Sequence, residues 1–427
     1  MTSVKLENAA ASPGSRSGIV LFLGTLLLWV IPVDFVRLNP TWSSLSQGLT
    51  AALGLAAVIL IVRARHLRIA LVASLVLLLL TSSLATGSVV PPFEFLLPFL
   101  IGVGLALGLT RGQFGVALVI FGTMAFISIC IDTLTHGPTT SSLFGSPIQL
   151  STLTGTRSRG LIGQPVPAAF VCLALTASLA WLATAIRSRS RRFVAWFATG
   201  ASLIVTLITT GTRSALIALL ATAALMFLAA ILRSGWRVLI PLVVWSPAVA
   251  ATLIILFQTV GSGFSGTRLG DFGGLNGSAS LSNRLYALEF LHRWASSTNL
   301  VDQIIGHGPR NLQQTLSAYQ GATSLNTIDN LFVTVLWDFG LFGVLLLFIL
   351  FVIALRRLLS TDLLLSSAAI GVAAILLSGL AFDALYTRPM AIIFAAMATQ
   401  LFLRTPNDAD ATDTVITNSR PKGSTVK

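Results

Sequence analysis

Apolar blocks of 17 or more residues recur from one end of the chain to the other. A block of this length can form a helix that crosses the hydrocarbon core of a bilayer, which is about 30 Å thick. Only 10% of the 427 residues are charged, whereas about 25% are charged in a soluble domain. Because helices satisfy their own backbone hydrogen bonds in lipid, the sequence predicts an all-α membrane protein, a polytopic helical bundle.

The apolar blocks predict about 12 transmembrane helices. We expect them at residues 18–35, 46–62, 69–86, 93–110, 114–133, 164–186, 193–210, 214–232, 238–258, 328–355, 363–381 and 387–403. The resulting organisation is an N-terminal tail (1–17), nine helices (18–258), a long loop (259–327), three helices (328–403) and a Thr/Asp/Ser-rich tail (404–427) that we expect to be disordered. Only Thr210–Arg213 separate two of these spans, so their division depends on the loop charges.

Basic residues are concentrated in alternate connections. One set of connections, together with both termini, holds 18 of the 27 Lys and Arg residues and five acidic residues. The other set holds nine Arg and nine Asp or Glu residues, whose charges cancel. The formal net charge of +13 is therefore a positive-inside signal rather than a nucleic-acid surface. It predicts cytoplasmic termini and an even number of spans.

Two long segments fall on the predicted outer side, at 134–163 and 259–327. Within the second, Leu285, Leu288, Leu291 and Trp294 recur at helical spacing, and Arg284 lies off that stripe. The pattern predicts an amphipathic helix over 281–297 that lies at the membrane interface. Long loops in a chain that otherwise has short connections are usually functional, so we expect function on the outer side.

Three arginines stand beside predicted helix starts on this side. Arg157 and Arg159 precede the helix at 164–186, and Arg213 lies in the connection before the helix at 214–232. A guanidinium pairs bidentately with phosphate oxygens, and helix N-termini also favour anions. The positions favour an anion site, with snorkelling to lipid headgroups as the alternative.

The end of the long loop holds a tight-turn motif, Ile304-Ile-Gly-His307-Gly-Pro-Arg310. A histidine titrates near neutral pH, so His307 is a candidate general base. The alternative is a structural or solvated loop histidine.

Two carboxylates follow near the tenth predicted helix. Asp329 stands at its mouth, and Asp338 lies nine residues further along the helix, about 13 Å at a rise of 1.5 Å per residue. A carboxylate within a membrane helix indicates function and needs an arginine partner or a proton. For Asp329 the alternative is an N-cap. Gly340 and Gly343 are predicted to allow close helix packing.

The chain has no Walker loop, no dinucleotide-binding glycine fingerprint and no His/Cys metal spacing,. This argues against a soluble-nucleotide enzyme. A lipid-linked donor fits better, with its phosphates at the outer arginines and its tail between helices.

Three motifs resemble those of the O-antigen ligase and polymerase superfamily of bacterial membrane glycosyltransferases, in order and over nearly the whole chain. The first is Arg157-Ser-Arg-Gly-Leu-Ile-Gly-Gln164-Pro, with Gln164 where the family has Asn. The second is Thr210-Gly-Thr-Arg213-Ser-Ala-Leu. The third is Ile305-Gly-His-Gly-Pro followed by Asp329-Asn330 and Asp338–Gly343.

The resemblance implies a GT-C-like bundle with the long extracytoplasmic loop between helices 9 and 10. It implies transfer of a glycan from an undecaprenyl-diphosphate donor to an acceptor glycan or glycolipid at the outer leaflet of the bacterial inner membrane. Neither a nucleotide sugar nor a metal nor another cofactor is expected. Arg157 and Arg213 would hold the diphosphate and Asp329 would act as base or orienter. Substrate binding would fall to Arg159, Arg284, His307, Arg310 and Asn330.

One departure bears on the acceptor. Ligases that act on lipid A core place a His before the Asn of the loop-exit motif, and this chain has Asp329 there. A polymerase or a different acceptor is therefore favoured, with polysaccharide export machinery as an expected partner. The alternatives are a transporter or flippase of lipid-linked glycans and a structural membrane protein.

Overall fold

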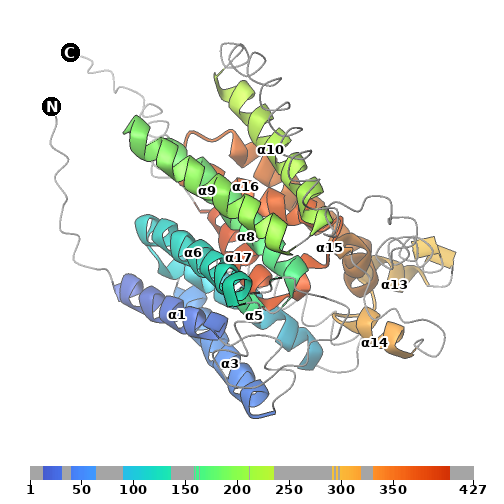
Figure 1. Ribbon diagram of the computed structural model, residues 1–427. Coiled ribbons are helices and arrows are strands. Elements are labelled where there is room, and N and C mark those ends of the chain that lie inside the picture. Colours follow the sequence, from blue (N-terminus) through green and yellow to red (C-terminus); the bar gives the residue numbers. More distant parts are fainter. Residues whose placement is uncertain are drawn as a thin grey trace, which may run out of the picture.

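A computed structural model describes residues 13–30, 40–63, 90–135, 158, 160–162, 164–210, 212–234, 291–292, 295–296, 299–318 and 330–403. These residues form helices and connecting turns, without a strand among them (Figure 1). Five of the described helices are long and apolar enough to cross a membrane: Ser43–Arg63, Arg111–Thr135, Pro165–Leu182, Arg189–Thr210 and Leu331–Leu358. The prediction of an all-helical chain with membrane-spanning helices is thus confirmed at this level.

Ten predicted spans coincide with described helices. These are α1 (Pro13–Val30), α3 (Pro40–Arg63), α5 (Val90–Gly108), α6 (Arg111–Thr135), α8 (Pro165–Leu182), α9 (Arg189–Thr210), α10 (Arg213–Ser234), α15 (Leu331–Leu358), α16 (Leu363–Ser378) and α17 (Arg388–Gln400). The predicted spans at 69–86 and 238–258 lie outside the described residues. The division between 193–210 and 214–232 is confirmed, because α9 ends at Thr210 and α10 begins at Arg213.

One boundary of the predicted organisation differs from the structure. Helix α1 begins at Pro13 rather than at residue 18, because proline is favourable in the first helical turn, where its missing N–H has no partner to lose. The loop predicted at 259–327 contains two short helices, α13 (Leu300–Ile305) and α14 (Asn311–Ala318). Of the predicted interfacial helix 281–297, only residues 291, 292, 295 and 296 are described, all in helical conformation.

Helices α8 and α16 form the centre of the bundle (Figure 1). Residues Ala168–Leu175 of α8 are almost completely buried. The two helices are joined by a reciprocal pair of hydrogen bonds: the Ser178 hydroxyl donates to the Ser367 carbonyl at 3.0 Å, and the Ser367 hydroxyl donates to the Ser178 carbonyl at 2.7 Å. Small hydroxyl residues let helices approach closely and bond to each other, as is typical inside membranes.

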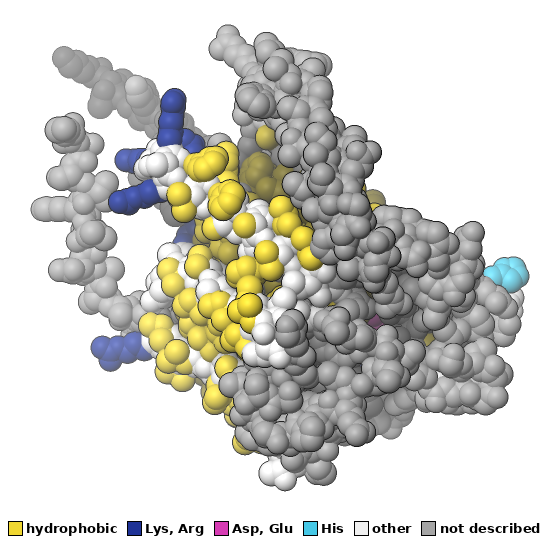
Figure 2. Space-filling model, in the orientation of Figure 1, with side chains coloured by type: hydrophobic (Ala, Val, Ile, Leu, Met, Phe, Trp, Pro, Cys, Tyr) yellow, Lys and Arg dark blue, Asp and Glu magenta, His cyan; other side chains and the backbone are white. Residues whose placement is uncertain are grey.

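The outer helices expose large apolar side chains. Their most exposed members include Val20, Leu55, Val116, Phe193, Ile217 and Phe348. In Figure 2 the hydrophobic side chains form a broad surface over the described helices, with Lys and Arg side chains gathered at its left edge. An apolar surface of this extent is unusual for a soluble protein and suits a lipid environment.

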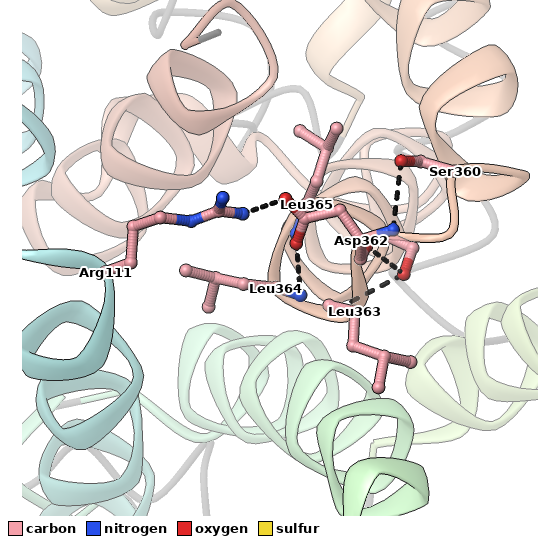
Figure 3. Close-up of polar contacts among 7 residues, drawn as sticks. Arg111, Ser360, Asp362, Leu363, Leu364 and Leu365 are labelled. Carbon is pink, nitrogen blue, oxygen red and sulfur yellow. Dashed lines mark hydrogen bonds and ion pairs between the residues drawn. The ribbon is translucent and has the colours of Figure 1, made fainter. Parts of the chain in front are cut away.

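Residues predicted to share the basic side are in contact. Arg111, at the start of α6, forms an ion pair with Asp362, which precedes α16 (Figure 3). The Asp362 carboxylate also caps α16 by accepting from the backbone N–H groups of Leu364 and Leu365. Both connections belong to the basic set defined by sequence, so this contact agrees with the predicted alternation of loops. We call this side the basic end, and the side that holds α13 and α14 the opposite end.

Candidate functional site

The first arginine motif is anchored by its residues Ser158 and Gly160. The Ser158 N–H donates to the Thr209 carbonyl at 3.1 Å, and its hydroxyl lies 2.8 Å from the Thr133 hydroxyl. The Gly160 N–H donates to the buried Asp132 carboxylate at 2.6 Å. The sequence motif therefore folds back onto the ends of α6 and α9.

The Ser158 contact brings two of the three sequence motifs together. Ser158 stands between Arg157 and Arg159 in the chain, and Thr209 precedes Arg213 by four residues. Arg213 is the first residue of α10. The positions of Arg157 and Arg159, and the side chain of Arg213, lie outside the described residues. The backbone hydrogen bond from Ser158 to Thr209 nevertheless places the two segments side by side.

An apolar cavity of about 550 Å³ lies between α8, α9 and α10. Its lining includes Leu173 and Trp181 from α8, Leu203 from α9, and Leu219 and Met226 from α10. Leu219 follows Arg213 by six residues, which corresponds to about 9 Å along a helix. The cavity thus begins about two helical turns after the start of α10, which carries Arg213,.

The second part of the candidate site is a break in α15. Gly340 has φ +63° and ψ −163° inside the helix, a conformation open almost only to glycine. Two carbonyls before the break accept from the loop at the opposite end: the His307 N–H donates to Trp337 O at 2.9 Å, and the Gly308 N–H donates to Asp338 O at 2.8 Å. The loop backbone therefore replaces helical partners at the break.

A glycine on each side makes this contact possible. A Cβ on Gly340 would lie 2.4 Å from the Ile304 carbonyl carbon, and one on Gly306 would lie 2.4 Å from the Phe339 nitrogen. From the sequence, Gly340 was predicted to allow close helix packing. It does permit a close approach, but to the backbone of α13 and through a broken helix.

Asp338 binds the loop from within α15. Its carboxylate accepts the Arg310 N–H at 2.7 Å, the Leu312 N–H at 3.1 Å and the Tyr386 hydroxyl. Burial raises the pKa of the Tyr386 phenol well above its ordinary value, so this hydroxyl is protonated and donates. From the sequence, Asp338 was expected to need an arginine partner or a proton; Arg310 contributes its backbone N–H instead of its guanidinium.

The Arg310 guanidinium bonds to Glu94, at the start of α5, at 3.0 Å. Arg310 has φ +64° and is the only described non-glycine residue with a positive φ. Such strain persists where surrounding contacts impose it and is common at functional sites. Here the hydrogen bond from the Arg310 N–H to Asp338 holds the backbone in this conformation, and the Arg310 guanidinium points toward α5.

His307 is fixed by Trp337 of α15. The two rings are stacked with centroids 4.3 Å apart and planes 16° apart, and His307 Nδ1 lies 3.2 Å from the Trp337 carbonyl. Because a carbonyl only accepts, Nδ1 is the donor of this hydrogen bond. Nε2 lies 3.9 Å from the Asp302 carboxylate. This arrangement is compatible with a base and also with a structural role.

Asn330 has a local structural task. Its side-chain oxygen caps α15 by accepting from the N–H groups of Phe332 and Val333, and its amide nitrogen lies 3.4 Å from the Leu380 carbonyl. The N-cap of α15 is thus Asn330 rather than Asp329, since the helix begins at Leu331. Asp329 and Arg284 lie outside the described residues.

Of the predicted site residues, the structure therefore brings His307 and Arg310 together beside the break in α15, with Asn330 at the start of this helix. Glu94 and Tyr386 were missed by sequence reasoning, because neither belongs to a motif near the long loop. Their partners lie 216 and 48 residues away in the chain.

Comparison with protein-family models and with curated proteins finds no match to this chain.

Replacing Gly340 with alanine is expected to destabilise the protein by about 2 kcal/mol or more, because the backbone conformation is strained for any L side chain. The new Cβ would also displace Ile304. Thermal unfolding of the purified protein measures the loss. Gly200→Ala is the matched control, because a Cβ there meets nothing within 4 Å. Equal unfolding temperatures for the two variants would show that the break is not required.

Proposed function

We propose that the protein is a GT-C-like membrane glycosyltransferase of the O-antigen ligase and polymerase type. It joins a polyprenyl-diphosphate-linked glycan to an acceptor glycan or glycolipid at the outer leaflet of the bacterial inner membrane. The observation that carries the proposal is the hydrogen bond between Ser158 and Thr209. It supports a single diphosphate site because the Arg157–Arg159 segment and the segment before Arg213 are adjacent.

In this mechanism the guanidinium groups of Arg157 and Arg213 bind the donor diphosphate. The acceptor hydroxyl oxygen attacks the anomeric carbon, and the bond from that carbon to the diphosphate oxygen breaks with its electron pair on the leaving group. Asp329 takes the hydroxyl proton. Preorganised positive charge stabilises the leaving diphosphate, which is the main contribution expected of such a site.

The apolar cavity supports a lipid-linked donor. Its lining by α8, α9 and α10 gives part of a polyprenyl chain an apolar volume on the membrane side of Arg213. The segment 299–318 supports an acceptor site at the opposite end, since its attachment to α15 fixes His307 and Arg310.

The rival function is a transporter or flippase of lipid-linked glycans, and the broken helix α15 favours it, because transporters use discontinuous helices at their substrate sites. The break in α15 differs from those of transporters, because the backbone N–H groups of the 299–318 segment, rather than a substrate or ion, bind the carbonyls of Trp337 and Asp338.

Reconstitution separates the two functions. The protein is placed in liposomes that hold a lipid-linked glycan in one leaflet, and both the glycan's leaflet and its length are followed. The proposed function predicts longer or transferred glycan. Movement between leaflets with the length unchanged would support the transporter and exclude our proposal.

A further inference from the structure

Arg388 was not singled out by any sequence motif. It begins α17, and its guanidinium donates through Nη1 to the hydroxyl of Ser46 in α3. The Arg388 side chain is half-buried and Ser46 is completely buried. A guanidinium carries five N–H donors, so a single neutral hydroxyl leaves most of this group's donor capacity for another partner.

No carboxylate in the described part of the chain forms an ion pair with Arg388. The carboxylates of the same region are engaged elsewhere: Glu94 with the Arg310 guanidinium, and Asp338 with Tyr386 and the loop N–H groups. Arg310 and Glu94 are the charged side chains that act electrostatically on Arg388. Among the described residues the Arg388 guanidinium is therefore left without an ion-pair partner, while the nearby Arg310 guanidinium has Glu94.

A half-buried guanidinium without an ion-pair partner near membrane helix ends is costly unless an anion binds to it. Guanidinium groups match phosphate oxygens in geometry and bind them by charge-assisted hydrogen bonds. A phosphoryl group is therefore the ligand class that this cluster suits.

We propose that Arg388, with Ser46 and Arg310, forms a second anion site that binds a phosphoryl group of the acceptor substrate. It is built from other elements than the Arg213 site: α10 packs on α8, α9 and α16, whereas the Arg388 cluster lies where α17 meets α3, α5 and the 299–318 segment. The assignment to the acceptor rests on the proposed glycosyltransferase function. It implies that the acceptor is itself anionic, as a lipid-linked or phosphorylated glycan is.

The test measures binding of farnesyl diphosphate to the full-length protein in phosphatidylcholine nanodiscs. All variants carry Arg157→Ala and Arg213→Ala, which remove both arginines of the proposed donor site. Adding Arg388→Gln is expected to weaken binding by about tenfold, the loss of roughly one charge-assisted hydrogen bond. Arg356→Gln makes the same charge change at an exposed position of the basic end and is expected to leave the dissociation constant within about twofold. Binding that is equal in these two variants would overturn the proposal.

Glu94→Gln provides a test in the opposite direction. It removes the carboxylate that pairs with Arg310 and acts electrostatically on Arg388, so the diphosphate is expected to bind several-fold more tightly. A damaged fold would not produce tighter binding. Arg388→Lys keeps the charge but loses the planar pair of donors, and should fall between the parent and Arg388→Gln. No gain with Glu94→Gln, or no loss with either Arg388 variant, would contradict the anion site.

A bilayer phospholipid offers the same phosphoryl chemistry as the acceptor. A second experiment, which changes the lipid composition, distinguishes a headgroup from the acceptor as the ligand of Arg388. Part of the phosphatidylcholine is replaced with phosphatidylglycerol, and the ratio of dissociation constants between Arg388→Gln and its parent is measured again. An acceptor site keeps its Arg388 dependence. Loss of that dependence would mean that headgroups occupy the cluster, which would overturn the acceptor assignment.

These binding measurements need no turnover. If the wild-type protein joins no glycan while diphosphate binding still depends on Arg388, the proposed function fails and the anion site stands. If glycan is joined and Arg388→Gln binds the diphosphate as its parent does, the anion site fails and the proposed function stands.

Discussion

Arg213→Ala is expected to lower glycan transfer by about 100- to 1000-fold, the loss found when one preorganised group that stabilises developing charge is removed. Arg213 begins α10, directly after the segment that bonds to Ser158 of the other arginine motif. The leaving diphosphate would lose half of its predicted arginine pair. The rate of product formation by protein purified from membranes measures the effect.

The matched control for this variant is Arg356→Ala, which removes an exposed arginine from the basic end. It is expected to transfer glycan at the wild-type rate, while both variants reach the membrane in equal amounts. Full activity of Arg213→Ala would refute the placement of the diphosphate. Equal loss in both variants would indicate a general need for positive charge rather than a site.

Asp338→Ala is expected to destabilise the protein by about 3 kcal/mol or more, because it leaves three buried or partly buried donors without their acceptor. These are the N–H groups of Arg310 and Leu312 and the hydroxyl of Tyr386. Amide hydrogen exchange should rise first at Arg310 and Leu312, since the carboxylate is the acceptor that protects them. Thermal unfolding and residue-resolved exchange provide the two measurements.

Two milder variants bracket this effect. Tyr386→Phe removes one of the three donors, and Asp338→Asn keeps one acceptor oxygen, so each should lose less stability than Asp338→Ala. Unchanged exchange at Arg310 in the alanine variant would show that Asp338 does not hold the segment. A loss confined to unfolding temperature, with exchange in 299–318 as in the wild type, would show the same.

The helical architecture was predictable because hydropathy and loop charge act locally. The start of α10 at Arg213, three residues after α9 ends at Thr210, could be inferred because the basic residues at 233 and 237 would otherwise fall on the wrong side. The start of α13 also carries a readable signal: Asn299 caps it by accepting from the Asp302 N–H, a local pattern of the kind that marks helix N-termini.

The partners of the site residues could not be predicted in this way. The sequence shows that Asp338 needs a partner, but Tyr386 is selected by how α15 meets the connection between α16 and α17, and Glu94 by how the loop meets α5. The break at Gly340 was also hidden, since Gly340 and Gly343 resemble helix-packing glycines and only the freed carbonyls at Trp337 and Asp338 reveal the difference. Arg388 had no motif to mark it.

The central claim is that the protein transfers a glycan from a lipid diphosphate. The most direct measurement incubates purified protein with polyprenyl-diphosphate-linked glycan and acceptor, and quantifies both free polyprenyl diphosphate and joined glycan. The proposed function predicts one polyprenyl diphosphate released for each glycosidic bond formed, with release strongly reduced by Arg213→Ala. A glycan that stays attached to its original lipid, under conditions where the protein binds it, would contradict the claim.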